Sequence, residues 1–330
     1  MPRLPLTFAC GDYDRTRALA EGTIRPDGIE LNYLRLPVEE TFFRMMRHRE
    51  FEVAEMSLSS YVLSLQADPA PFVALPVFTS RMFRHGGIYC HAGAGIERPE
   101  DLPGKTVGTP EFQVSAGVWI RGILADRHGV PIGSVRYLTG GQESPGRTEK
   151  APLQLSTDLD ISRIAPDRTL SAMLAEGEID ALYTPRIPGP FAARDPRVRR
   201  VFTDTVAAEK EYFTATGIFP IMHVVVVRRD VYERHPWVAQ SLTKALGLAK
   251  QEAMASLYDS SALRFMLPWL NQELEQTRDL LGDDFWSYGL QSNVEVLSTF
   301  LRYHHEQGLS RRRLAPEELF APESTESAVI

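Results

Sequence analysis

The chain has 330 residues, of which 43% are hydrophobic and 24% are charged. These proportions are typical of a globular protein and exclude a disordered chain, a coiled coil and a collagen. The 36 basic and 43 acidic side chains give a net charge of −7, which provides no general attraction for nucleic acid.

The cysteine content and the hydropathy pattern predict where the protein works. Cys10 and Cys90 are the two cysteines, too few for a disulfide framework or a CxxC zinc site. No stretch approaches the roughly 18 apolar residues of a membrane span. Residues 1–14 lack the basic and apolar segments of a secretory signal. We therefore expect a cytoplasmic protein with neither membrane nor nucleic acid as a partner.

The first ninety residues alternate short apolar runs with amphipathic stretches, the pattern of an α/β protein. Strands are predicted at 6–10, 30–36, 53–56 and 72–78, and helices at 16–21, 37–48 and 57–66. Ser57 is the expected N-cap of the third helix.

The same rhythm resumes after residue 93. Strands are predicted at 105–109, 135–138 and 181–184, and helices at 115–128 and 169–178. Residues 139–168 are rich in Gly, Pro, Ser, Asp and Arg, so we expect a long loop there with one strand at 154–157. Loops of this length in a compact domain are usually functional or mobile.

The last third of the chain is mainly helical. A strand at 222–228 is followed by helices predicted at 236–257, 261–281 and 293–306, and by a frayed tail after residue 322.

Two predicted strands, 88–91 and 222–228, could cross between two lobes. The first lobe would then comprise 1–92 and 226–330, and the second, inserted lobe would comprise 93–225. Two α/β lobes joined by two crossing strands form a hinged scaffold with a cleft, which is the natural place for a small ligand.

Nucleotide-binding motifs do not fit the sequence. Residues 141–148, GQESPGRT, imitate a P-loop but no helix can follow them, and 93–95 lack the third glycine of a dinucleotide site. Neither HExxH nor GxSxG occurs.

Polar residues follow several predicted strands at the end where open α/β sheets bind ligands. Ser57 begins a helix whose free N–H groups suit a carboxylate. Arg81 can grip a carboxylate with two hydrogen bonds, and His85, four residues later, can move a proton near neutral pH. His223 also precedes a predicted crossover strand, so the two imidazoles would meet at the cleft floor.

Simpler interpretations of the same residues stay open. Ser57 can be an N-cap alone, Arg81 a surface charge, and each histidine a hydrogen-bonded core residue.

Several long strings spread over nearly the whole chain carry a family resemblance. They include CGDYDRTRAL, EFEVAEMSLSSY, SRMFRH, DLPGKTVGTPEF, GEIDALYTP, TGIFPIMHVVVVRRD and EELFAP. Together they resemble the 4,5-dihydroxyphthalate decarboxylase family. The resemblance implies a two-lobe fold of the type II periplasmic-binding-protein kind and a carboxy-lyase of phthalate degradation. The implied reaction is the cofactor-free conversion of 4,5-dihydroxyphthalate to 3,4-dihydroxybenzoate.

The resemblance also implies roles for particular residues. Arg81 would clamp the retained carboxylate, supported by Arg15 and Ser57. His85 would protonate the ring carbon and Glu111 or His223 would deprotonate the phenol, although the two histidines could exchange roles. Tyr13 and Phe112 would enclose the ring.

The same residues and the same scaffold also allow other functions. His85, Glu111 and His223 would form a divalent-metal site if they converge. A solute-binding protein of an importer shares the scaffold, as does a pyridoxal-phosphate-dependent thiamin-pyrimidine synthase, but the latter carries a cysteine cluster that this chain lacks. A homo-oligomer is possible.

Overall fold

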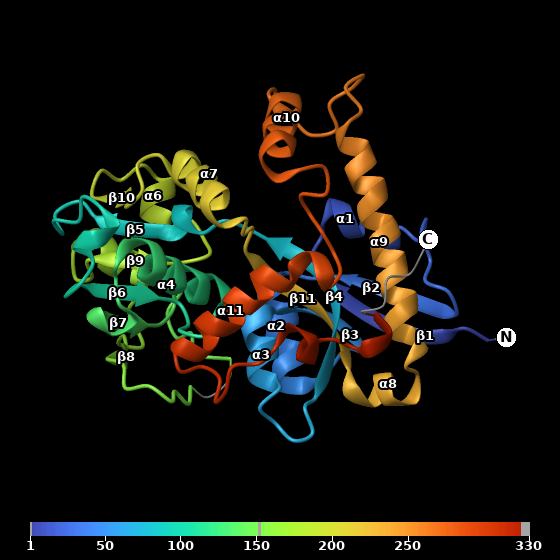
Figure 1. The fold of residues 1–330 in the computed structure, drawn as a ribbon. Coiled ribbons are helices and arrows are strands. Elements are labelled where there is room, and N and C mark those ends of the chain that lie inside the picture. The colour runs from blue at the N-terminus through green and yellow to red at the C-terminus, as the bar shows by residue number, and fades with distance from the viewer. Residues whose placement is uncertain (1, 151–152, 325–330) are drawn as a thin grey trace. The chain divides into compact units, whose positions relative to one another are not determined.

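The computed structural model describes residues 2–150 and 153–324, and its chain divides into two compact units (Figure 1). Unit 1 comprises Met1–Arg81, Ile221–Ser298 and Leu314–Ile330. Unit 2 comprises Met82–Pro220 and Thr299–Arg313.

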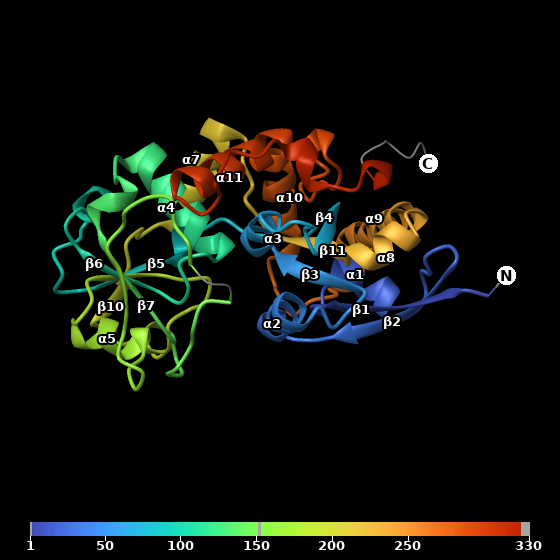
Figure 2. The ribbon, with the colours of Figure 1, turned by 90° about the horizontal axis from the view of Figure 1, so that it is seen from below.

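Unit 1 is built on a five-stranded sheet with the strand order β2-β1-β3-β11-β4. The strands are β1 (Leu4–Cys10), β2 (Ile29–Arg35), β3 (Val53–Ser57), β4 (Phe72–Arg81) and β11 (Ile221–Arg228). β1 runs parallel to β2 and β3, whereas β11 is antiparallel to both of its neighbours (Figure 2). Because the chain goes from β1 to β2 on one side and then to β3 on the other, a topological switch point lies between β1 and β3.

One face of this sheet packs against helices α1 (Asp14–Ala20) and α9 (Trp237–Leu257). Alternate residues of the strands supply this core, as the two-residue period of a strand requires. The core includes Leu6, Phe8, Leu75, Val77, Val225, Leu242 and Leu246. Helices α2 (Val38–His48) and α3 (Leu58–Ser64) contact β3, and α8 (Arg229–Arg234) follows β11.

Unit 2 is built on a six-stranded sheet with the order β10-β5-β9-β6-β7-β8. The strands are β5 (Ile88–His91), β6 (Thr106–Thr109), β7 (Arg136–Thr139), β8 (Ile161–Arg163), β9 (Ala181–Tyr183) and β10 (Val198–Arg200). Its helices are α4 (Ser115–His128), α5 (Leu170–Glu176), α6 (Gly189–Ala192) and α7 (Thr205–Thr216). α5 forms a core cluster with β5 and β9.

A segment from late in the chain completes unit 2. The division between the units falls within α11 (Val294–Glu306). The fully buried Trp119 ring of α4 lies 5.5 Å from the ring of Phe300 and 5.6 Å from that of Tyr303. A Cβ atom on Gly122 would lie only 2.1 Å from the Tyr303 ring, so the approach requires glycine.

Two predicted elements are wrong in position. The strand expected at 154–157 is instead β8, at Ile161–Arg163. The helix expected at 261–281 begins only at Leu270, as α10 (Leu270–Leu281), because Pro268 cannot donate a helical hydrogen bond and its ring obstructs the preceding turn. The tail predicted to fray after residue 322 instead begins with a 3-10 turn at Pro322–Ser324, and its remaining residues lie outside the described ones.

The unit boundaries differ from the predicted lobe boundaries of 1–92 plus 226–330 and 93–225. Among the described residues, β5 pairs with β9 and β10, so it lies in unit 2, and β11 pairs with β3 and β4, so it lies in unit 1. Among the described residues, no helix is long and apolar enough to cross a membrane.

Candidate functional site

The candidate site lies at one edge of the unit 1 sheet. β1 ends there at Cys10, β3 ends there at Ser57 and β4 ends there at Arg81. Near the start of the antiparallel β11, His223 is in register with Ser57 on β3. This edge includes the switch point between β1 and β3, where open α/β sheets bind ligands.

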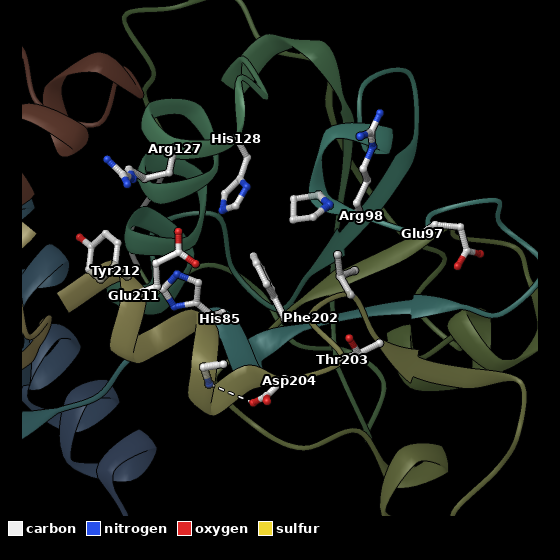
Figure 3. A pocket seen from close by; sticks show the side chains of 14 residues that line it. His85, Glu97, Arg98, Arg127, His128, Phe202, Thr203, Asp204, Glu211 and Tyr212 are labelled. Atoms are coloured by element: carbon white, nitrogen blue, oxygen red, sulfur yellow. Dashed lines mark hydrogen bonds between the residues drawn. The ribbon is translucent and has the colours of Figure 1, made fainter. Parts of the chain in front are cut away.

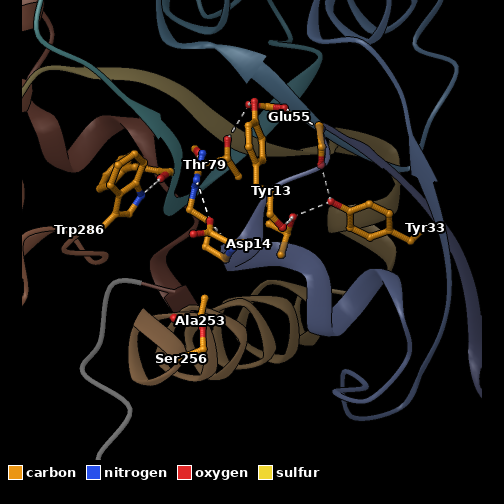
Figure 4. Close-up of polar contacts among 12 residues, drawn as sticks. Tyr13, Asp14, Tyr33, Glu55, Thr79, Ala253, Ser256 and Trp286 are labelled. Atoms are coloured by element: carbon orange, nitrogen blue, oxygen red, sulfur yellow. Dashed lines mark hydrogen bonds and ion pairs between the residues drawn. The ribbon is translucent and has the colours of Figure 1, made fainter. Parts of the chain in front are cut away.

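The carboxylate of Glu55 is the centre of a hydrogen-bond network at this edge. Its Oε1 accepts from the Tyr13 hydroxyl at 2.9 Å and the Thr79 hydroxyl at 2.9 Å, and it lies 2.7 Å from His223 Nδ1. Its Oε2 accepts from the Gly11 backbone N–H at 3.0 Å. Figure 4 shows Tyr13 and Thr79 converging on Glu55.

Glu55 is ionised although it is fully buried. Burial acts to raise its pKa, but the positive charge and hydrogen bond of His223, with hydrogen bonds from Gly11 and Tyr13, outweigh burial. They hold the pKa of Glu55 below the ordinary value of 4.5. The carboxylate therefore carries its negative charge at neutral pH.

His223 stands at an irregularity in β11. Its pairing with β4 shifts register on both sides of His223, and such bulges re-aim side chains next to functional sites. The Phe42 ring packs edge-on against the imidazole at 4.8 Å. The His223 side chain is 17% exposed while that of Glu55 is 0% exposed, so the imidazole joins a buried carboxylate to the surface of unit 1.

Arg15 lies beside this network. Its guanidinium carbon is 4.1 Å from the centre of the Tyr13 ring and 4.4 Å from that of Trp286. Its Nε donates to the Thr79 carbonyl at 2.6 Å, and its Nη1 donates to Asp14 at 3.1 Å. Burial, followed by the charge of Glu55, raises the pKa of Tyr13, which stays a protonated donor.

Arg81 is held by partners within unit 1. Its buried Nη2 donates to the carbonyl oxygen of Ser287 at 2.7 Å and to the side-chain oxygen of Asn293. Burial lowers the pKa of Arg81 to about 10, so the cation persists at neutral pH. Its role as a carboxylate clamp stays a prediction.

His85 lies in unit 2, in a cavity of about 410 Å³ lined in part by α4 and α7 (Figure 3). The rings of Phe202 and Tyr212 lie 5.1 and 5.2 Å from the imidazole. Burial, followed by the charge of His128, lowers the pKa of His85 to about 4. The imidazole is therefore neutral at pH 7, and its Nδ1 has no hydrogen-bond partner among the described residues.

Glu111 and Phe112 are buried in unit 2. The Glu111 carboxylate accepts from Arg147 Nη2 at 2.5 Å and from Lys150 Nζ at 2.7 Å. The guanidinium carbon of Arg121 lies 3.8 Å from the centre of the Phe112 ring. Their predicted roles, as a base and as a wall for the substrate ring, stay predictions.

The structure thus brings five of the predicted residues to one edge of unit 1, namely Tyr13, Arg15, Ser57, Arg81 and His223. Sequence analysis did not single out Glu55 or Thr79. A signal for Glu55 was present, because a carboxylate inside the apolar run 53–57 needs a partner when it is buried.

In 2–150 and 153–324, no group of three or more His, Cys, Asp or Glu side chains is arranged to hold a metal ion.

Comparison with known proteins decides the family. The chain is 41% identical over 327 residues to the 4,5-dihydroxyphthalate decarboxylase of Comamonas testosteroni, covering 99% of each protein. The chain belongs to the 4,5-dihydroxyphthalate decarboxylase family. A decarboxylase of the same name from Pseudomonas putida is 40% identical over 215 residues, or 65% of this chain and 83% of that protein. No family model matches the sequence.

Solved structures confirm the predicted fold class. The aliphatic sulfonate-binding protein SsuA from Escherichia coli has a TM-score of 0.54 at 13% identity and covers 97% of this chain and 98% of its own. A sulfonate-binding SsuA protein from Methylobacillus flagellatus has a TM-score of 0.55 at 12% identity, with 98% and 93% covered. Both are periplasmic binding proteins, and at these identities the likeness concerns the fold of this family member alone.

Proposed function

We propose that the protein is a carboxy-lyase that converts 4,5-dihydroxyphthalate to 3,4-dihydroxybenzoate and carbon dioxide. Membership of the decarboxylase family supports the reaction. The observation that carries the site is the His223 imidazole, which bridges the buried Glu55 carboxylate and the surface of unit 1 at the switch point.

The reaction needs three proton movements. The departing carboxylate is para to a phenol, and loss of the phenol proton moves electron density to the carbon that carries this carboxylate. A proton added to that carbon allows the carbon–carbon bond to break. The bonding pair returns to the ring, carbon dioxide leaves, and the phenolate regains a proton.

We propose that His223 donates the proton that the ring carbon gains. The negative charge of Glu55 stabilises a positively charged imidazole, which is a proton donor. This assignment uses the exchanged roles of the two histidines. His85 is a poor donor at pH 7 because its pKa is about 4. The base roles of Glu111 and His85 stay predictions.

We propose that Arg15 binds the substrate carboxylate that stays on the ring. Its guanidinium contacts the rings of Tyr13 and Trp286, and among the described residues its Nη2 has no hydrogen-bond partner. A guanidinium held in this way can present N–H groups to a carboxylate. Ser57, at the start of α3, supports the same anion through its position at the sheet edge.

A turnover assay tests the proposal. Purified protein treated with EDTA would be incubated with 4,5-dihydroxyphthalate and a panel of hydroxylated aromatic acids, and the products would be weighed by mass spectrometry. We expect 4,5-dihydroxyphthalate to lose the mass of carbon dioxide. Loss of turnover with EDTA and its return with a divalent cation would instead assign the reaction to a metal enzyme.

The assay also separates the enzyme from a solute-binding protein, the class to which the fold neighbours belong. A binding protein would raise its melting temperature with an aromatic acid and return that acid unchanged. His223→Gln should remove turnover, whereas His48→Gln, an exposed histidine of the same unit, should not.

We further propose a reducing, cytoplasmic setting, in which the free and buried thiols of Cys10 and Cys90 persist. The partner is a small aromatic carboxylate. A homo-oligomer stays a prediction.

A further inference from the structure

We propose that Glu55 is a positioning residue that fixes which nitrogen of His223 exchanges a proton with the substrate. The inference rests on the proposed function, in which His223 donates a proton. Glu55 itself is fully buried and acts through His223.

The hydrogen-bond inventory determines where the imidazole proton lies. An ionised carboxylate only accepts hydrogen bonds. Because His223 Nδ1 lies 2.7 Å from Glu55 Oε1, Nδ1 must carry a proton and donate it. The nitrogen that gains and loses a proton is then Nε2. This arrangement suits a donor that must regain a proton after each turnover, because loss of the Nε2 proton always leaves the same tautomer, with the proton on Nδ1.

The surroundings hold the ring in that orientation. The register shift in β11 directs His223 toward β3 and β4, and Phe42 packs edge-on against the imidazole. Tyr13 and Thr79 donate to the same Oε1, which fixes the carboxylate from two further elements. The orientation of the proton donor is therefore set by four other side chains of unit 1, those of Phe42, Glu55, Tyr13 and Thr79.

The two oxygens of Glu55 differ in a way that predicts the effect of Glu55→Gln. Oε2 faces the backbone N–H of Gly11, a donor that cannot rotate away. Oε1 faces two hydroxyls, which can turn to accept, and an imidazole, which can change tautomer. The glutamine amide should therefore keep its oxygen toward Gly11 and turn its NH₂ toward His223. The imidazole must then accept at Nδ1 and carry its proton on Nε2.

The test combines kinetics with nitrogen NMR of labelled protein. Glu55→Gln should lower kcat by about 10²- to 10⁴-fold, the usual contribution of a placed acid or base. KM should change by less than about threefold, because the carboxylate contact of Arg15 is kept. In the protein without substrate, at a pH high enough for the His223 ring to be neutral, the ring should carry its proton on Nδ1 in the wild type and on Nε2 in Glu55→Gln.

Glu52→Gln is the matched control. It removes one negative charge just before β3, where Glu52 accepts from the backbone N–H of Thr7 at 2.9 Å, and it should leave kcat and the tautomer of His223 unchanged. A fall in kcat in both variants would overturn the positioning role. So would a Glu55→Gln enzyme that keeps its kcat, or a wild-type ring with its proton on Nε2.

The two proposals fail in different ways. If the wild type turns over but Glu55→Gln is unaffected, decarboxylation stands and the positioning role is wrong. If the wild type does not turn over any aromatic acid, the proposed function is wrong, while the NMR tautomer of His223 still decides whether Glu55 controls its proton. The wild-type spectrum also decides this point if Glu55→Gln does not fold.

Discussion

Arg15 and Arg81 are two arginines of unit 1 that differ in what holds their guanidinium groups. Arg15 lies between two aromatic rings, whereas Arg81 is buried and donates to Ser287 and Asn293. A guanidinium that contacts rings through its flat faces can offer the N–H groups at its edge to a ligand. A buried one bonded to a loop contributes to the stability of that loop.

Arg15→Gln should therefore weaken the binding of dicarboxylates. We expect the Kd of 4,5-dihydroxyphthalate to rise about 10- to 100-fold, the value of one charged hydrogen bond or slightly more, measured by calorimetry. The Kd of a mono-acid analogue should change much less. Arg25→Gln, at an exposed position of the same unit, is the control. Equal losses for both acids would contradict the assignment of Arg15.

Arg81→Ala distinguishes a role of Arg81 in substrate binding from a role in stability. The sequence-based role as a clamp predicts a loss of about 2–4 kcal/mol in dicarboxylate binding. The contacts with Ser287 and Asn293 predict a lower melting temperature with the dicarboxylate preference kept. Thermal unfolding and binding measured on the same variant decide between these outcomes.

The lowered pKa of Glu55 makes stability depend on pH. A carboxyl group whose pKa is lower in the folded state stabilises the fold above its unfolded pKa, near 4.5. This stabilisation is lost as the pH falls through the folded value. Urea unfolding from pH 7 downwards should show the stability of the wild type converging on that of Glu55→Gln. A difference between the two proteins that stays constant with pH would contradict the ion pair.

At the scale of single elements, α4 depends on one close contact. A methyl group at Gly122 would meet the ring of Tyr303 at 2.1 Å, in a helix whose residues from Ser115 to Leu124 are all buried. Gly122→Ala should lower the free energy of unfolding by about 1–3 kcal/mol, the usual result of overpacking. Chemical unfolding would measure it.

Gly247→Ala in α9 is the matched control. Nothing lies within 4 Å of the methyl group that it adds, so the better helix propensity of alanine should leave the stability unchanged or raise it by up to about 1 kcal/mol. If both substitutions had the same effect, the contact with Tyr303 would not be what demands glycine.

The elements also explain how far sequence reasoning reaches. Apolar runs identify buried strands such as β1 and β3 because hydrophobic burial dominates their energetics. The short β10 and the helices α6 and α7 were missed, since their residues are mostly exposed or only partly buried. The start of α10 was misplaced because apolar spacing alone outweighed Pro268.

Some residues of the candidate site could likewise be predicted from the sequence, and others could not. The rule that ligands bind beyond strand ends identified Ser57, and the family resemblance implied Tyr13 and Arg15. The partnership of Glu55 with His223 could not be predicted, because the two residues are 168 positions apart and meet only through the register of β3 with β11. A pairing of distant strands is fixed by the fold and not by local spacing.

The whole molecule has the fold of periplasmic binding proteins and belongs to a family of decarboxylases. A shared fold sets where a ligand is held but leaves the chemistry to the side chains at that place. In unit 1 this place contains a buried carboxylate, an imidazole and a cation between aromatic rings. Such a set can move protons as well as bind an anion.

The contribution of residues 299–313 to unit 2 has a consequence for biosynthesis. Trp119 and Arg121 of α4 rest on Phe300, Tyr303 and Gln307, which the ribosome adds almost two hundred residues later. Until then the nascent chain exposes an apolar face of α4, including Arg121, which is buried in the folded protein. Unit 2 therefore reaches its final packing only after residues 299–313 have been translated, and a chain that stops before residue 299 is one that chaperones and proteases can recognise as incomplete.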